Sequence, residues 1–177
     1  MTNYRRYRLK GGRCFFTVAL ADRRGCLLID YIQALRTAFR MIKAAHPFTV
    51  EAVVILPDHL HCIWTLPEGD DEFSMRWRRI KGAFSRQLPK TERRSQSRLK
   101  KGERGIWQRR FWEHLIRDED DCRHHVDYIH YNPVKHGYVK TVADWPHSSF
   151  HRYVKLSMYP GDWASSHLSD KVIKEMA

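Results

Sequence analysis

Residues 49–64, T-V-E-A-V-V-I-L-P-D-H-L-H-C-I-W, decide the fold that this sequence predicts. Two runs rich in β-branched and other apolar residues flank Pro57-Asp58. A proline-aspartate pair between two such runs is typical of a turn. We therefore expect an antiparallel hairpin whose strands cover 49–56 and 59–66.

The second strand of this hairpin begins with a histidine pair. Side chains alternate between the two faces of a strand, so His59 and His61 point to one face and Leu60 points into the core. Two imidazoles on one rigid strand can hold a divalent cation. In a chain with 11 histidines, a His-x-His pair arises by chance about once, so a surface strand with two solvated histidines is the alternative.

The segments around the hairpin carry strand or helix periodicity. We expect further strands at 13–20 and within 106–117, and helices at about 31–45, 72–88 and 118–131. The order strand, helix, strand, strand, helix, strand, helix is the split β-α-β arrangement of a ferredoxin-like fold. The fold class is therefore α+β with a central antiparallel sheet, and the last helix can lie across its open face.

Local signals predict where the helices begin and end. Asp30 can cap the first long helix, and the acids at 118–121 suit the N-terminus of the last one. We expect Asn132-Pro133 and His136-Gly137 to stop that helix. Residues 89–105 are polar and basic without periodicity, which predicts a mobile loop.

The length of 177 residues suits one domain. We expect one main domain at 1–155 and a C-terminal extension of unknown role at 156–177. No apolar run reaches the roughly 18 residues of a membrane span, and the N-terminus has no apolar signal core. These features predict a cytoplasmic, nucleoid-associated protein. The four cysteines form no C-x-x-C pair, which argues against a structural zinc site.

The charge of the chain points to a polyanionic partner. The formal net charge is +12 and the pI is about 9.8, so nucleic acid is the first candidate and an anionic membrane surface the second. Residues 76–110 hold 14 lysines and arginines against two glutamates, with aromatic residues between them. Cations neutralise phosphates and aromatic rings stack on unpaired bases, although a solvated basic loop is the plainer interpretation. The residues expected to contact DNA are Arg5, Arg6, Arg76, Arg78, Arg79, Lys81, Arg93, Arg94, Lys100, Lys101, Trp107, Arg109 and Arg110.

A second motif, Y-I-H-Y-N-P-V-K-H-G, occupies 128–137. Tyr128 and Asn132 are four residues apart and therefore share one face of a helix. Tyr128 can act as a nucleophile, and the amide oxygen of Asn132 can be a third metal ligand. Tyr131 is the rival nucleophile. A tyrosine-rich helix packed on a sheet and ended by Asn-Pro is the structural alternative.

The two motifs together resemble the signatures of the REP-associated tyrosine transposases, single-tyrosine members of the HUH nucleases. P-D-H-L-H-C-I-W at 57–64 matches the HUH motif, and Y-I-H-Y-N-P-V-K-H-G matches the tyrosine motif. Further likeness lies in I-W-Q-R-R-F-W-E-H-L-I-R at 106–117 and W-P-H-S-S-F-H-R-Y at 145–153. The order and spacing of these stretches cover most of residues 10–153.

The resemblance implies an activity and a set of site residues. His59 and His61 would be the metal-binding pair, Tyr128 the catalytic tyrosine and Asn132 the ligand one helical turn on. The cofactor would be Mg or Mn, and sequence does not choose between them. The substrate would be single-stranded or hairpin DNA of repetitive extragenic palindromes, cut and rejoined through a 5′-phosphotyrosine link.

Two other functions stay open at this point: a nucleic-acid-binding protein with a decayed site, and a hydrolase that uses a metal-bound water. We expect a monomer rather than a homodimer, because the C-terminal extension can cover the site or an interface. His124, His125 and His130 are expected to be solvated or capping, and His114 to be a neighbour of the site at most.

Overall fold

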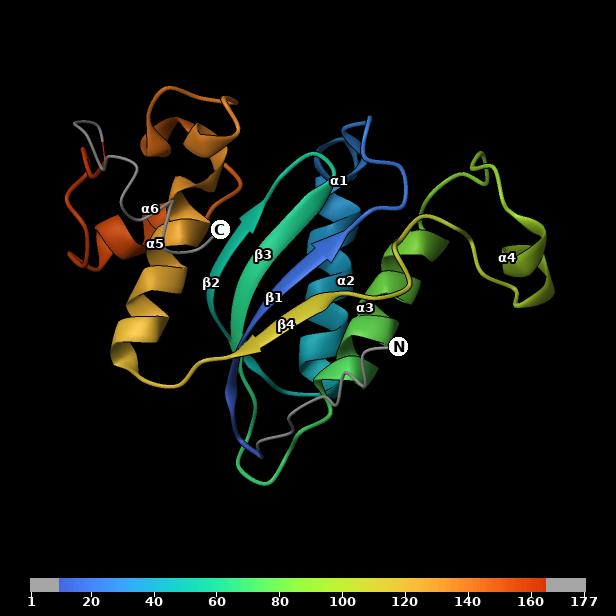
Figure 1. Ribbon diagram of the computed structural model, residues 1–177, viewed down its shortest axis with the longest axis horizontal. Helices are drawn as coiled ribbons and strands as arrows, with labels where there is room; N and C mark the ends of the chain where they lie inside the picture. Colours follow the sequence, from blue (N-terminus) through green and yellow to red (C-terminus); the bar gives the residue numbers. More distant parts are fainter. Residues whose placement is uncertain (1–9, 165–177) are drawn as a thin grey trace, which may run out of the picture.

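The computed structural model describes residues 10–164, and its centre is a four-stranded antiparallel sheet of order β2-β3-β1-β4 (Figure 1). The strands are β1 (Arg13–Ala19), β2 (Thr49–Ile55), β3 (His59–Thr65) and β4 (Trp112–Leu115). This order and the alternation of strands with helices confirm the predicted ferredoxin-like α+β fold.

The predicted hairpin forms as β2 and β3. The backbone N–H of Leu56 donates to the carbonyl of His59 at 2.8 Å across the Pro57-Asp58 turn. On its other edge β3 pairs with β1, and this register sets Thr17 directly opposite His61. Directly opposed residues of an antiparallel pair share one face of the sheet, so the two side chains are neighbours.

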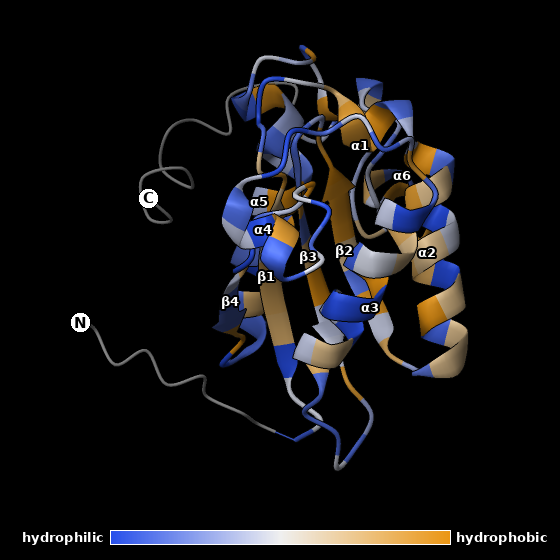
Figure 2. Ribbon diagram, turned by 90° about the vertical axis from the view of Figure 1, so that its right-hand side faces the viewer, coloured by the Kyte–Doolittle hydropathy of each residue, from blue (hydrophilic) through white to orange (hydrophobic). Residues whose placement is uncertain are grey.

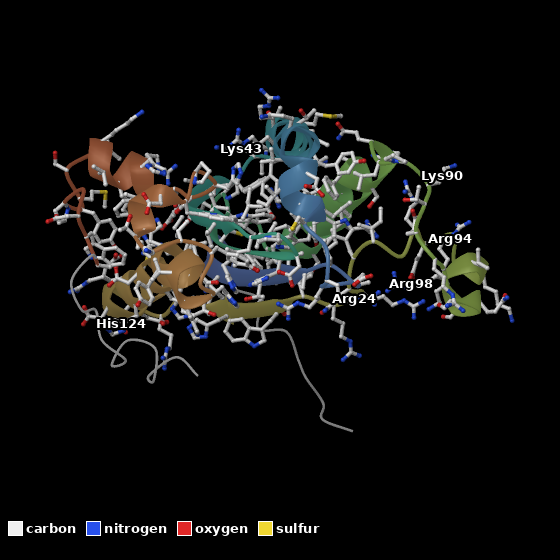
Figure 3. The ribbon with its side chains drawn as sticks, turned by 90° about the horizontal axis from the view of Figure 1, so that it is seen from above. Arg24, Lys43, Lys90, Arg94, Arg98 and His124 are labelled. Atoms are coloured by element: carbon white, nitrogen blue, oxygen red, sulfur yellow. The ribbon has the colours of Figure 1, made fainter. Side chains whose placement is uncertain are left out.

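Helices cover both faces of the sheet (Figures 1 and 3). Helices α1 (Leu27–Asp30), α2 (Ile32–Ala45) and α3 (Phe73–Arg86) belong to one side. The other side holds α5 (Glu119–Lys135), the short 3-10 helix Val142–Asp144 and α6 (Phe150–Lys155).

Each face of the sheet has its own apolar core, because side chains alternate along each strand. On the α2/α3 side the rings of Trp64 and Trp77 stack with centroids 4.2 Å apart. On the α5 side Phe15 and Ile63 pack with Ile129. In Figure 2 the strand β2 is accordingly orange (apolar) along most of its length, whereas the edge strand β4 is blue (polar).

Two predicted helix boundaries are wrong. Asp30 does not cap α2: it is the last residue of α1, and α2 begins after Tyr31 without a side-chain cap. Asn132-Pro133 does not stop α5, which continues through Pro133 to Lys135. A proline in the last turn removes a single backbone hydrogen bond, and burial of the helix around it offsets that loss.

The other predicted stop, at His136-Gly137, is confirmed: α5 ends at Lys135, His136 is its C-cap and Gly137 follows directly. This glycine has φ +71°, the left-handed conformation that glycine adopts without strain. Its N–H donates to the carbonyl of Val134 at 2.9 Å, and the N–H of Tyr138 donates to that of Pro133 at 3.0 Å. These two bonds form a Schellman motif. At the other end the acids at 118–121 lie at the helix N-terminus as predicted, and Asp118 caps the helix by accepting from the N–H of Asp121 at 2.8 Å.

Residues 89–105 are more structured than the expected loop. They contain α4 (Gln96–Lys100), which stands away from the sheet at the right of Figure 1. Arg104 ties the segment to the end of α3, because its guanidinium donates to the carbonyls of Leu88 at 3.1 Å and Pro89 at 2.6 Å and pairs with Glu92. We call residues 89–105 the basic arm.

The described part of the C-terminal extension folds back onto α5. The hydroxyl of Tyr159 donates to Asp127, and its ring lies 4.6 Å from that of Trp163. Residues 156–164 therefore pack with the domain assigned to 1–155. Residues 165–177 lie outside the described part, as do Arg5 and Arg6. Within residues 10–164 no helix is long and apolar enough to span a membrane.

Candidate active site

The histidine pair of β3 faces α5. His59 and His61 are both about 4% exposed, and their ring centroids lie 4.9 Å apart. The solvated-histidine alternative is therefore excluded by burial. Thr17, on the adjacent strand, and Asp58, in the hairpin turn, are the partners of the two imidazoles.

Each imidazole is held through its Nδ1 atom. His59 Nδ1 lies 2.7 Å from the Asp58 carboxylate, and His61 Nδ1 lies 2.8 Å from the Thr17 hydroxyl. Arg23 in turn donates to the other Asp58 oxygen at 2.5 Å. If Nδ1 of His59 carries the proton and donates it to Asp58, Nε2 keeps a lone pair that can bind a metal ion. Hydrogen-bond partners such as Asp58 orient metal-binding histidines.

Burial also sets the protonation of these groups. It lowers the pKa of His59, against the hydrogen bond to Asp58, and lowers that of His61 well below its ordinary value. Burial opposes ionisation of Asp58, but hydrogen bonds from His59 and Arg23 overcome this and hold the carboxyl pKa below its ordinary value. The two imidazoles are therefore neutral at pH 7, which is the form that ligates metal ions.

Helix α5 brings its motif residues against this pair. The ring centroid of Tyr128 lies 5.2 Å from that of His61, and the ring of His136 lies 5.3 Å from that of His59. Tyr128, Asn132 and His136 are spaced at i, i+4 and i+8, so they share one helix face. Asn132 therefore lies between the two rings, along the strand face that carries the histidines. His136 is a neighbour that the sequence analysis missed, although the same spacing could have revealed it.

The donor set fits a divalent cation. His61 Nε2 and both side-chain amide atoms of Asn132 are buried without a hydrogen-bond partner, and such orphaned groups are costly unless something satisfies them. Two imidazole nitrogens and an amide oxygen suit Mn²⁺, and they leave room for the oxygen ligands that Mg²⁺ prefers. His59, His61 and Asn132 are thus the residues that could hold the ion.

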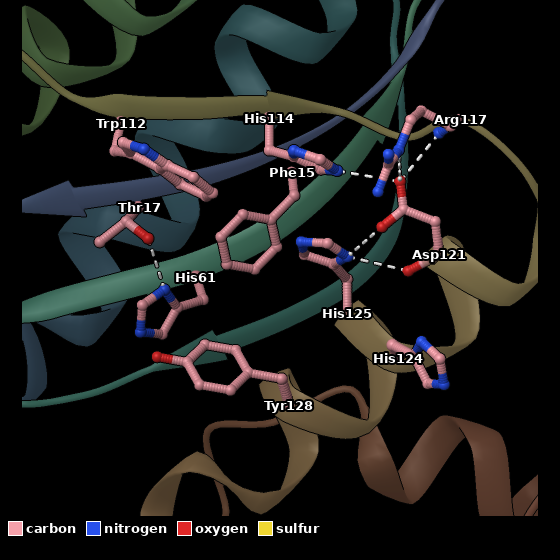
Figure 4. Close-up of a pocket in the computed structure, with 10 residues that line it drawn as sticks. All are labelled: Phe15, Thr17, His61, Trp112, His114, Arg117, Asp121, His124, His125 and Tyr128. Atoms are coloured by element: carbon pink, nitrogen blue, oxygen red, sulfur yellow. Dashed lines mark hydrogen bonds and ion pairs between the residues drawn. The ribbon is translucent and has the colours of Figure 1, made fainter. Parts of the chain in front are cut away.

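A cavity of about 610 Å³ opens beside Tyr128, between β4 and α5 (Figure 4). His114, expected to be a neighbour of the site at most, and His125, expected to be solvated or capping, both line this cavity. Both also contact Asp121. His114 Nε2 lies 2.9 Å and His125 Nδ1 3.0 Å from the carboxylate. Burial opposes ionisation here too, but the hydrogen bond from His114 prevails and the Asp121 pKa is lowered to about 2.

The expectation for His130 is also wrong. This residue is fully buried, and its Nε2 lies 2.9 Å from the hydroxyl of Ser149. Burial lowers its pKa to about 3, so it is a neutral core histidine. His130 lies on the side of α5 that contacts α6, next to Phe150 and Tyr153. The sequence of α5 alone could not predict this burial, because it does not show that α6 packs there.

Comparison with known proteins identifies the family. Residues 14–132 match the family model "Transposase IS200 like". The chain is 53% identical to a REP-associated tyrosine transposase of Haemophilus influenzae, over 94% of this chain and 95% of the relative. It is 54% identical to the Escherichia coli K12 protein of that name, over 93% and 92%. A solved REP-associated tyrosine transposase bound to a REP hairpin superimposes with a TM-score of 0.80 at 53% identity, covering 96% of each chain.

The chain belongs to the REP-associated tyrosine transposases. The resemblance inferred from the two motifs is therefore confirmed, and it extends over nearly the whole chain.

Two residues of the chain that were predicted to contact DNA are internal. The guanidinium of Arg76 is 2% exposed, pairs with Asp70 at 2.5 Å and donates to the carbonyl of Pro47 at 2.9 Å. Trp107 is 7% exposed and packs edge-on against Phe84 in the core. Both predictions are corrected: these side chains stabilise the fold.

The other predicted cations in the described part are accessible, with differing local partners. Lys81 donates to the carbonyl of Gln108 at 3.1 Å, and Arg109 pairs with Glu103 at 2.8 Å. Arg94 and its neighbours extend from the basic arm in Figure 3. The exposed cations of the predicted set are Arg78, Arg79, Arg93, Arg94, Lys100, Lys101, Arg109 and Arg110.

Proposed function

We propose that this chain is a metal-dependent endonuclease and strand transferase that acts on single-stranded DNA beside a hairpin. The observation that carries the proposal is the place of Tyr128, whose phenol lies 5.2 Å from the His61 ring with its buried, partnerless Nε2. Membership in the tyrosine transposases agrees with a tyrosine nucleophile at this position.

Tyr128 performs the covalent step. Its Oη loses the phenol proton as it attacks the scissile phosphorus, an O–P bond forms, and the bond from phosphorus to the 3′ oxygen breaks. The leaving oxygen takes a proton and becomes a free 3′-OH, while the 5′ phosphate stays on the tyrosine. A 3′-OH that attacks this ester reverses the step, so cleavage and strand transfer need neither water nor ATP.

His59, His61 and Asn132 would hold the cation, Mg²⁺ or Mn²⁺. Such an ion, when bound, supplies charge withdrawal from the phosphate oxygens and orientation of the phosphate. Thr17 and Asp58 keep the imidazoles in place. Lys135, whose Nζ lies 4.9 Å from the centre of the Tyr128 ring, places a positive charge beside the nucleophile.

The proposed substrate is a hairpin-forming palindrome. The solved relative is bound to a REP hairpin, and the exposed cations of α3 and the basic arm give this chain a surface for phosphates. We also propose that the chain acts as a monomer, because residues 156–164 cover α5 at Asp127, through Tyr159, and at His130, through Trp163. Sedimentation at micromolar concentration tests that state, and a concentration-dependent dimer would contradict it.

Covalent trapping tests the activity. The protein is incubated with end-labelled hairpin DNA carrying a single-stranded flank, with Mn²⁺ or Mg²⁺, and the products are separated on a denaturing gel. We expect a protein–DNA adduct from the wild type and from Tyr131→Phe, none from Tyr128→Phe, and none from the double variant His59→Ala/His61→Ala. DNA that is bound without an adduct would indicate a binding protein, and hydrolysis without an adduct would indicate a metal hydrolase.

A further inference from the structure

The cavity between β4 and α5 has a chemistry that the metal centre does not use. We propose that it receives one unpaired nucleobase next to the scissile phosphate, an inference that rests on the proposed function. At about 610 Å³ it has the size of a small-molecule pocket, which spans roughly 300–1,000 Å³.

The cavity has a platform of parallel rings. Trp112 and His114 are parallel within 7° with centroids 6.0 Å apart, and His114 and His125 are parallel within 14° at 4.6 Å. The structure describes all six tryptophans, and Trp112, at 54%, is the exposed one among them. Exposed aromatic faces of this kind stack on unpaired bases.

The same rings offer polar edges. Asp121 holds each imidazole at one nitrogen, and the other nitrogens of His114 and His125 point away from Asp121 towards the cavity in Figure 4. These nitrogens can hydrogen-bond the edge of a base. Arg117 lies at the rim, with its side chain 75% exposed, where it can meet the backbone of the same nucleotide.

The network favours a base over a second cation, although the ligand atoms of His114, Asp121 and His125 all lie within 4.8 Å of one another. His125 Nδ1 lies 2.8 Å from the backbone carbonyl of Asp121, which makes that nitrogen a proton donor rather than a metal ligand. The N–H of Arg117 also donates to the carboxylate at 2.9 Å. The carboxylate is thus already satisfied by protein donors.

The position of the cavity links the base to the reaction. The ring of Phe15 lies 5.6 Å from that of Trp112 and 6.1 Å from that of Tyr128. A base stacked on Trp112 therefore belongs to a nucleotide close to the phosphate that Tyr128 attacks. The cavity would then select and hold the nucleotide that aligns this phosphate.

Hairpin oligonucleotides with a single abasic site, moved one position at a time along the flank, test this inference. The proteins are wild type, Trp112→Ala, Trp112→Phe and the control Met41→Ala, whose exposed side chain lies on α2 across the sheet. Adduct formation is measured in single turnover and affinity at equilibrium. A stacked base contributes about 1–3 kcal/mol, which corresponds to roughly 5- to 150-fold.

We expect one abasic position to lower adduct formation and affinity roughly 5- to 150-fold in the wild type and in Met41→Ala. Trp112→Ala should lose a similar factor on intact DNA and become insensitive to that position, and Trp112→Phe should recover most of the loss. A Trp112→Ala protein that matches the wild type on every oligonucleotide would overturn the inference.

Two further outcomes separate the inference from its alternatives. If the wild type forms no adduct, the proposed function fails. The base site is then tested by DNA affinity alone, and it is refuted if no abasic position lowers that affinity. Asp121→Asn should bind as many equivalents of Mn²⁺ as the wild type in calorimetry. A lost equivalent would assign the cavity to a cation and contradict a base site.

Discussion

The phenol ring of Tyr128 meets the imidazole of His61 nearly edge-on, with centroids 5.2 Å apart and planes at 68°. This relationship depends on Thr17, which faces His61 across the β1–β3 pair and fixes its Nδ1. The nucleophile and the histidine pair therefore come from a helix and a strand that only the packed sheet brings together.

The Thr17 hydroxyl should set the orientation of His61. Thr17→Val keeps the shape and removes the hydrogen bond, and loss of such an outer partner lowers metal affinity by about 10- to 100-fold. Calorimetric titration with Mn²⁺ measures this. Thr37→Val on α2 is the matched control and should bind as the wild type does. Equal affinity of both variants would show that Thr17 does not position a ligand.

Arg76 should matter for stability and not for DNA. Arg76→Met leaves Asp70 and the carbonyls near Pro47 without their buried partner, and breaking such a pair costs about 3 kcal/mol. Urea unfolding measures the loss, and the DNA affinity of the folded fraction should not change. Arg79→Met, at the exposed neighbour, should leave the stability unchanged and lower the DNA affinity. A stable Arg76→Met protein with weak DNA binding would restore the original prediction.

The basic arm should contribute to DNA affinity through phosphate contacts. If Arg93, Arg94, Lys100 and Lys101 each neutralise one phosphate, changing all four to Gln flattens the plot of log affinity against log salt by up to roughly 3 units. Sequence preference should hardly change, because phosphate contacts do not read bases. Arg40→Gln with Lys43→Gln, on α2, is the control. An unchanged slope in the four-fold variant would mean that the arm is merely solvated.

The Asp121 carboxylate should stabilise the fold in a pH-dependent way. Its pKa is about 2 in the folded state, because hydrogen bonds, led by that from His114, outweigh its burial. A depressed carboxyl pKa stabilises the protein above the unfolded value near 3.8 and loses this effect as pH falls towards 2.

Asp121→Asn measures that contribution. The variant should be less stable than the wild type by about 1–2 kcal/mol at pH 7, and the difference should shrink below about pH 4. Urea unfolding of both proteins from pH 7 to pH 2.5 provides the comparison. A difference that stays constant over this range would show that the ionised carboxylate is not the cause.

Local patterns were sufficient for the parts of the site that lie within one element. Strand alternation alone puts His59 and His61 on one face, and helical spacing alone puts Tyr128 and Asn132 on one face. The acidic run at 118–121 predicted where α5 begins, because the helix dipole favours acids in the first turn. The stop signal at Asn132-Pro133 failed because packing of the helix outweighs one lost backbone bond.

Only the tertiary structure decided which side chains are free to act. Arg76 looks like its basic neighbours in the sequence, yet Asp70 and the end of α2 enclose it. Trp107 is likewise a core residue, whereas Trp112 is exposed beside the nucleophile. His114 and His125 become partners through Asp121, and His136 reaches His59 across the gap between helix and strand. Exposure and pairing depend on segments that are distant in the chain, and a local pattern contains no information on which segments will meet.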